Sequence, residues 1–157
     1  MMWFDKHDAR ALFIDNRRET HPIDIGTPGT IGRNPIVIDP DELADFTALP
    51  FADESFHLVV FDPPHVERKA MLGAVTRRFG ILTGDWRAML SKGFVECFRV
   101  LKPNGTLIFK WGEPQFPISE ILQLTPHKPL FGHKTRKHTC WCVFMKDRSS
   151  ETETGER

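Results

Sequence analysis

An acidic residue followed by two prolines and a histidine, Asp62-Pro63-Pro64-His65, is the part of the chain best suited to chemistry. The apolar run at residues 58–61 predicts a buried strand, and the prolines end it because they cannot donate to a strand ladder. A carboxylate is therefore expected at the tip of a strand, beside a rigid turn. Ligands of α/β sheets bind beyond the carboxyl ends of the strands, so Asp62 is expected to face a binding crevice.

Two other predicted strands end on residues with polar chemistry. Residues 11–14 are apolar and end at Asp15, and residues 106–109 are apolar and end at Lys110-Trp111. The apolar spacing predicts a helix over residues 85–100, stopped at residues 103–105 by Pro-Asn-Gly. The remaining expected elements are strands at 36–38 and 139–146 and a helix at 118–124.

This alternation of strands and helices predicts an α/β fold with a largely parallel sheet. The carboxyl ends of parallel strands meet at one edge of a sheet. Asp15, Asp62 and Lys110 are therefore expected to line one site.

The Asp62–His65 segment resembles the Asp-Pro-Pro-aromatic signature of S-adenosylmethionine-dependent amino-methyltransferases, which act on adenine or cytosine in nucleic acids. The resemblance implies that Asp62 and the Pro63 carbonyl accept the two hydrogens of the base's amine, whose lone pair then faces the sulfonium methyl. Pro64 rigidifies the turn. His65 stands where the family has an aromatic residue that stacks on a flipped base, and an imidazole can also hydrogen-bond. An ordinary strand-ending proline turn is the alternative.

Two flanking segments extend the resemblance over about residues 36–112. Residues 45–59 are similar to the family's segment that precedes the fourth strand. Residues 96–107 are similar to the family's segment that leads into the fifth strand; they read Glu-Cys-Phe-Arg-Val-Leu-Lys-Pro-Asn-Gly-Thr-Leu. By this resemblance Asp45 binds the adenine amine of the cofactor and Phe46 packs on its ring. Asp15 corresponds to the acidic strand end that binds ribose hydroxyls, and a solvated turn carboxylate is the alternative. The predicted cofactor-binding set is Asp15, Asp45, Phe46, Phe61 and Asp62.

The chain departs from the family before Ala11, where only ten residues replace a strand, a glycine-rich loop and a helix. Residues 24–29 imitate the glycine motif but follow the acidic strand and contain a proline. We therefore expect a Rossmann-like methyltransferase fold truncated at the N-terminus, with Trp3, Phe4 and the loop at residues 16–35 in place of the missing wall. The pattern is similar to small methyltransferase-like proteins of prophages. Residues 1–148 are expected to form one domain and 149–157 a disordered tail.

Cations clustered within residues 127–138 beside Trp141, and others that follow the Asp62–His65 turn, suit contact with nucleic-acid phosphates. Lys+Arg and Asp+Glu balance at 21 each, so affinity for DNA or RNA must come from a local patch. The predicted substrate-binding residues are Arg68, Lys69, Lys110, Trp111, Lys134 and Arg136. For Trp111 and Lys110 the alternative is a purely structural role. For Lys134 and Arg136 the alternative is a position in a solvated hairpin loop.

Composition narrows the classes of protein to which this chain could belong. Three cysteines, Cys97, Cys140 and Cys142, argue against a disulfide framework, and their spacing predicts core thiols and no metal site. No apolar run is long enough for a membrane span, and a cytoplasmic protein is expected.

The predicted function is N-methylation of an exocyclic base amine with S-adenosyl-L-methionine, on DNA adenine first and RNA second, with a protein partner or a homodimer as a further expectation. One alternative is a non-catalytic protein of the same fold that binds cofactor or serves as a partner subunit. The other is a small-molecule methyltransferase.

Overall fold

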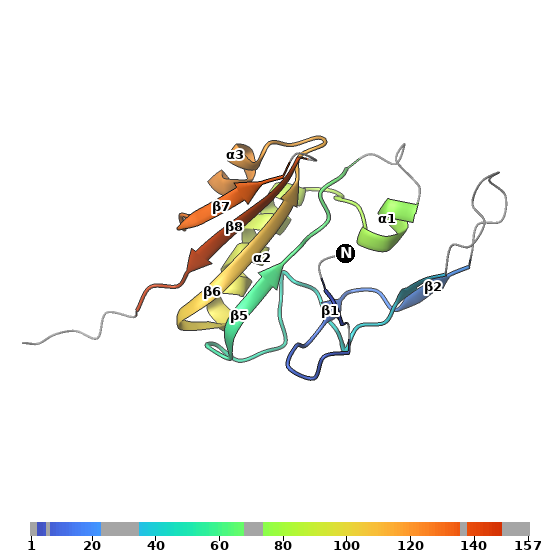
Figure 1. Ribbon diagram of the computed structural model, residues 1–157, viewed down its shortest axis with the longest axis horizontal. Coiled ribbons are helices and arrows are strands. Elements are labelled where there is room, and N and C mark those ends of the chain that lie inside the picture. Colours follow the sequence, from blue (N-terminus) through green and yellow to red (C-terminus); the bar gives the residue numbers. More distant parts are fainter. Residues whose placement is uncertain (1–2, 6, 23–34, 68–73, 136–137, 149–157) are drawn as a thin grey trace, which may run out of the picture.

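The computed structural model describes residues 3–5, 7–22, 35–67, 74–135 and 138–148. Its largest element is a four-stranded sheet in the order β5-β6-β8-β7. The bounds of these strands are Phe56–Phe61 for β5, Leu101–Gly112 for β6, Phe131–Lys134 for β7 and Thr139–Met145 for β8. The predicted fold class, α/β, is confirmed by this sheet and the helices that accompany it (Figure 1).

The sheet is mixed, so the expectation of a largely parallel sheet was wrong. Strands β5 and β6 are parallel, whereas β6 pairs antiparallel with β8, and β8 antiparallel with β7. The connection from β7 to β8 spans only residues 135–138, and a parallel pair would need a crossover of a dozen residues or more. All four residues of β7 are exposed, so this strand lacks the alternation that would reveal it in the sequence.

Helix α2, Trp86–Val100, confirms the predicted helix and lies against one face of the sheet (Figure 1). The Asp85 side chain accepts a hydrogen bond from the Ala88 backbone N–H at 3.1 Å, which caps the first turn. The apolar side of α2 buries Leu90, Phe94 and Phe98 against β6 and β8. The core is therefore built between α2 and the strands that end at the predicted site.

A glycine on α2 lets two aromatic rings approach the helix. A Cβ atom at Gly93 would lie 2.7 Å from Phe46 and 2.8 Å from Phe61. Phe61 is only 5% exposed and packs on Phe94, so it has little room to move. We expect Gly93→Ala to lower the free energy of unfolding by roughly 1–2 kcal/mol, because overpacking exceeds the gain in helix propensity.

Denaturant unfolding of Gly93→Ala beside Val95→Ala checks this prediction. Val95 is 60% exposed on the same helix, so its truncation should change stability little. A Gly93→Ala variant as stable as the unaltered protein would contradict the steric argument.

The N-terminal strands form two separate small pairings, apart from the main sheet (Figure 1). Strand β1, Ile14–Asp15, pairs parallel with β4, Glu42–Leu43, and β2, Glu19–His21, pairs antiparallel with β3, Ile36–Ile38. The strand expected over residues 11–14 is thus shorter and shifted toward Asp15.

Near the start of the chain, Trp3 packs edge-on against Phe13 with ring centroids 4.8 Å apart. Phe4 is fully exposed, so it does not form the wall that was expected of it. Residues 24–29 and 149–157 lie outside the described residues.

The remaining elements are short. Helix α1 is Ala74–Phe79, and the predicted helix at 118–124 is divided into α3, Ile118–Ile121, and the 3-10 turn η2, Leu122–Leu124. All three cysteines are buried and free, as expected. Within the described ranges, no helix combines the length and the apolar character that a membrane crossing requires.

Candidate functional site

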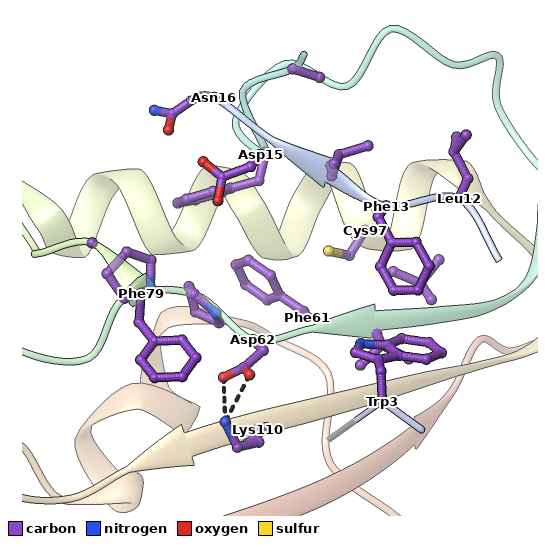
Figure 2. A pocket seen from close by; sticks show the side chains of 18 of the residues that line it. Trp3, Leu12, Phe13, Asp15, Asn16, Phe61, Asp62, Phe79, Cys97 and Lys110 are labelled. Carbon is purple, nitrogen blue, oxygen red and sulfur yellow. Dashed lines mark hydrogen bonds and ion pairs between the residues drawn. The ribbon is translucent and has the colours of Figure 1, made fainter. Parts of the chain in front are cut away.

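A cleft of about 1680 Å³ opens between the N-terminal segment and β5, runs along nearly the whole of this strand, and reaches Lys110 near the end of β6 (Figure 2). Asp15 lies at the end of β1, Asp62 directly after β5, and Lys110 near the end of β6. All three line this cleft, although β1 belongs to a different sheet. The predicted site residues found in its lining are Asp15, Phe46, Phe61, Asp62, Pro63, Pro64 and Lys110.

The Asp62 carboxylate is held by Lys110. The parallel register places Phe61 opposite Phe109, so the residues that follow them stand side by side. The Lys110 ammonium donates to Oδ1 of Asp62 at 2.9 Å and to Oδ2 at 2.7 Å, as Figure 2 shows. Each side chain is 22% exposed, so this ion pair is partly shielded from solvent but reachable from the cleft.

Two aromatic rings flank the same ammonium. The ring centroids of Phe79 and Trp141 each lie 6.0 Å from Nζ of Lys110, a distance at which a cation is attracted to a π face. Phe79 ends α1, and Trp141 lies opposite Lys110 in the β6–β8 register. Both rings line the cleft beside Asp62.

His65 packs behind the turn and is absent from the cleft lining. A Cβ atom at Gly112 would lie 2.7 Å from the His65 ring, so this glycine makes room for the imidazole. The indole of Trp111 meets the ring edge-on, with centroids 6.1 Å apart. The Pro63 carbonyl lies near enough to the imidazole to oppose the lowering of its pKa. His65 therefore borders the carbonyl that was predicted to accept an amine hydrogen.

Burial lowers the pKa of His65 below its ordinary value of 6.5; the Lys110 ammonium lowers it further, while Asp62 and the bond to Pro63 oppose the shift. Because the unfolded chain binds this proton more readily than the folded protein, folding stability should fall as pH drops below about 6.5. We expect the His65→Gln variant, whose side chain keeps an N–H donor but cannot titrate, to lose less stability as the pH drops.

Thermal unfolding of both proteins between roughly pH 7 and pH 5 measures the difference. Stability curves that stay parallel over this range would show that His65 does not contribute to the pH dependence.

The predicted ribose-binding carboxylate is also paired. Arg17 donates to Asp15 through Nε at 3.0 Å and through its Nη2 at 3.0 Å. The same guanidinium donates to the carbonyl of Arg77 at 3.1 Å, which ties β1 to helix α1. A ligand hydroxyl at Asp15 would therefore share the carboxylate with Arg17.

The two residues predicted to contact the adenine of the cofactor, Asp45 and Phe46, have different surroundings. Asp45 is exposed and accepts hydrogen bonds from the backbone N–H and the hydroxyl of Thr47, both at 2.8 Å, and it is absent from the cleft lining. Phe46 does line the cleft, and its ring packs on Phe61 with centroids 5.3 Å apart.

The predicted substrate residues are only partly brought together. Trp111 is fully buried and its indole N–H donates to the Phe116 carbonyl at 3.0 Å, which disagrees with stacking on a substrate. Its neighbour Lys110 points to the opposite face, since successive strand residues alternate. Lys134 forms an ion pair with Glu113, away from the cleft. Arg68, Lys69 and Arg136 lie outside the described residues.

Sequence reasoning did not identify three residues of the cleft as parts of this site: Arg17, Phe79 and Trp141. The strand alternation in residues 139–145 would have separated Trp141 from the buried cysteines on either side of it. Arg17 is only two residues from Asp15, but nothing local to Arg17 indicates its bond to the Arg77 carbonyl, and nothing local to Phe79 indicates its place beside Lys110. In the part of the chain that the structure describes, no group of three or more His, Cys, Asp or Glu side chains could hold a metal ion.

Neither a protein-family model nor a curated protein sequence matches the chain. Similar solved structures include the PH0226 protein from Pyrococcus horikoshii OT3, which is 16% identical, covers 66% of this chain and has a TM-score of 0.48. TTHA0409, "Putative DNA Modification Methylase" from Thermus thermophilus, is 19% identical over 73% of this chain with a TM-score of 0.45. Its complex with S-adenosyl-L-methionine is 20% identical over 69%, with a TM-score of 0.42. The chain spans 57%, 54% and 52% of the lengths of these three structures.

Proposed function

We propose that this protein has a Rossmann-like methyltransferase fold and is an S-adenosylmethionine-dependent N-methyltransferase that acts on an exocyclic amine of a nucleic-acid base, with DNA adenine first and RNA second. One observation carries the proposal. The Asp62-Pro63-Pro64 turn stands at a strand tip and lines the same cleft as Asp15. The acceptor for an amine and the acceptor for a ribose are therefore in one crevice.

The cleft is compatible with a nucleoside cofactor and a base together. Its volume of about 1680 Å³ exceeds the roughly 300–1,000 Å³ of most small-molecule pockets. Asp15 would hold ribose hydroxyls alongside Arg17, and Phe46 and Phe61 would border the adenine. S-adenosylmethionine would supply an electrophilic methyl group.

The residues of the turn would orient the nucleophile. An exocyclic amine is weakly nucleophilic because its lone pair is delocalised into the ring. Asp62 would accept one amine hydrogen and the Pro63 carbonyl the other, which favours a pyramidal nitrogen. Pro64 contributes no N–H to compete for these acceptors, and His65 would border the Pro63 carbonyl.

Methyl transfer to nucleic acid tests this proposal. The protein is incubated with methyl-labelled cofactor and single-stranded DNA or RNA, and the digested nucleosides are separated. We expect label in the N6-methylated adenine nucleoside of DNA. Absence of labelled nucleosides from both nucleic acids, with cofactor binding seen by calorimetry, would exclude the enzyme and leave a binding protein.

A non-catalytic protein of the same fold is the second candidate. The observation that favours it is that both predicted functional carboxylates are already paired inside the molecule, Asp62 with Lys110 and Asp15 with Arg17. Calorimetry with S-adenosylmethionine separates a cofactor-binding protein from one that only serves as a partner subunit.

A further inference from the structure

We infer that the Asp62–Lys110 ion pair recognises two neighbouring atoms of the base. Asp62 accepts a hydrogen bond from the amine, and Lys110 donates one to the ring nitrogen beside it. This inference rests on the proposed function and names the bases that the site would accept. It assigns Lys110 a role in specificity that orientation of the amine alone does not require.

The donor capacity of Lys110 supports this role. An ammonium has three N–H groups, and two of them suffice for the bonds to Asp62 at 2.9 and 2.7 Å. Among the described residues Asp62 is its one hydrogen-bond partner, so a third N–H remains for a ligand. The side chain lines the cleft and keeps 22% of its surface exposed.

The position of the pair fits a flat ligand with a donor next to an acceptor. A carboxylate only accepts and an ammonium only donates, and here the two are one hydrogen bond apart. Adenine presents its amine beside the N1 acceptor, and cytosine its amine beside N3. On its Watson–Crick edge guanine presents two donors, the amine and N1–H, so in this orientation it would place an N–H against the ammonium. The rings of Phe79 and Trp141 flank Lys110 and would border such a base.

Atom-specific substitution in the substrate tests the inference. Three single-stranded oligodeoxynucleotides carry one target residue each: adenine, 1-deazaadenine or 7-deazaadenine. We expect the unaltered protein to methylate the adenine oligonucleotide with a kcat/KM about 10- to 100-fold above that of the 1-deaza analogue, the range for a hydrogen bond to a charged group. The 7-deaza analogue keeps N1 and should resemble adenine.

Variants at Lys110 then isolate the contact. Lys110→Met removes the donor at similar length and should bring the preference for adenine over 1-deazaadenine close to 1, while Lys110→Arg should retain part of it. The preference of each variant is divided by that of the unaltered protein, because intrinsic differences in amine reactivity between the two substrates cancel in this ratio. If Lys110→Met turns over neither oligonucleotide, equilibrium binding of the same two with S-adenosylhomocysteine present supplies the ratio.

A Lys110→Met variant that keeps the full preference for N1 would overturn the inference and leave the proposed function standing. Failure of the unaltered protein to methylate either these oligodeoxynucleotides or adenine in RNA would instead remove the proposed function, and this inference with it.

Discussion

Asp62→Ala is expected to reduce kcat/KM for methyl transfer by about 10²- to 10³-fold, the usual cost of removing one preorganised polar group that acts on the reacting centre. The variant loses the acceptor for one amine hydrogen, so the nitrogen lone pair is no longer directed. Asp62→Asn keeps a carbonyl oxygen at the same place but loses the charge, and should be less impaired. Single-turnover methylation of an adenine-containing oligonucleotide measures both.

Two controls separate this catalytic loss from misfolding. Asp39→Ala removes another carboxylate, which pairs with Arg18 and is absent from the cleft lining, and should leave methylation unchanged. Thermal unfolding of Asp62→Ala shows whether the unpaired Lys110 destabilises the protein. Methylation by a folded Asp62→Ala variant at the normal rate would refute the assigned role.

Phe94→Ala should have the largest effect on stability, a loss of roughly 3–5 kcal/mol in the free energy of unfolding. Phe94 is 1% exposed and its ring contacts those of Phe61, Phe109 and Phe144, with centroids 5.5, 4.9 and 6.2 Å away. Truncation leaves a cavity beneath the strands whose tips carry Asp62 and Lys110. The positions of Asp62 and Lys110 should therefore become less well defined when the core is disrupted.

Denaturant unfolding of Phe94→Ala and Phe4→Ala compares a buried with an exposed ring of the same type. Phe4 is fully exposed, so its truncation should change stability little. A loss below about 1 kcal/mol at Phe94 would mean that the packing between α2 and the sheet is not the main source of stability.

The elements nearest the site could be predicted from local patterns. The apolar spacing within residues 85–100 corresponds to helix α2, and the apolar run before Asp62 corresponds to the end of β5. The helical spacing arises because α2 buries one side against the core, whereas the apolar run of β5 includes Leu58, which is 52% exposed. Strand β7 could not be predicted in this way, because its four exposed residues leave no periodic signal and backbone pairing with β8 alone defines it.

Residue types at strand ends determined which side chains of this protein would lie at the crevice: prolines end β5 after Phe61, and the strand period places Lys110 and Trp111 on opposite faces. Only the tertiary structure decided their partners. The pairing of Asp62 with Lys110 and the packing of His65 on Gly112 join positions that are far apart in the chain, and so does the bond from Arg17 to the Arg77 carbonyl. Such contacts follow from the register of β5 on β6 and from close packing around small residues, and packing is a property of the assembled core that no local sequence pattern contains.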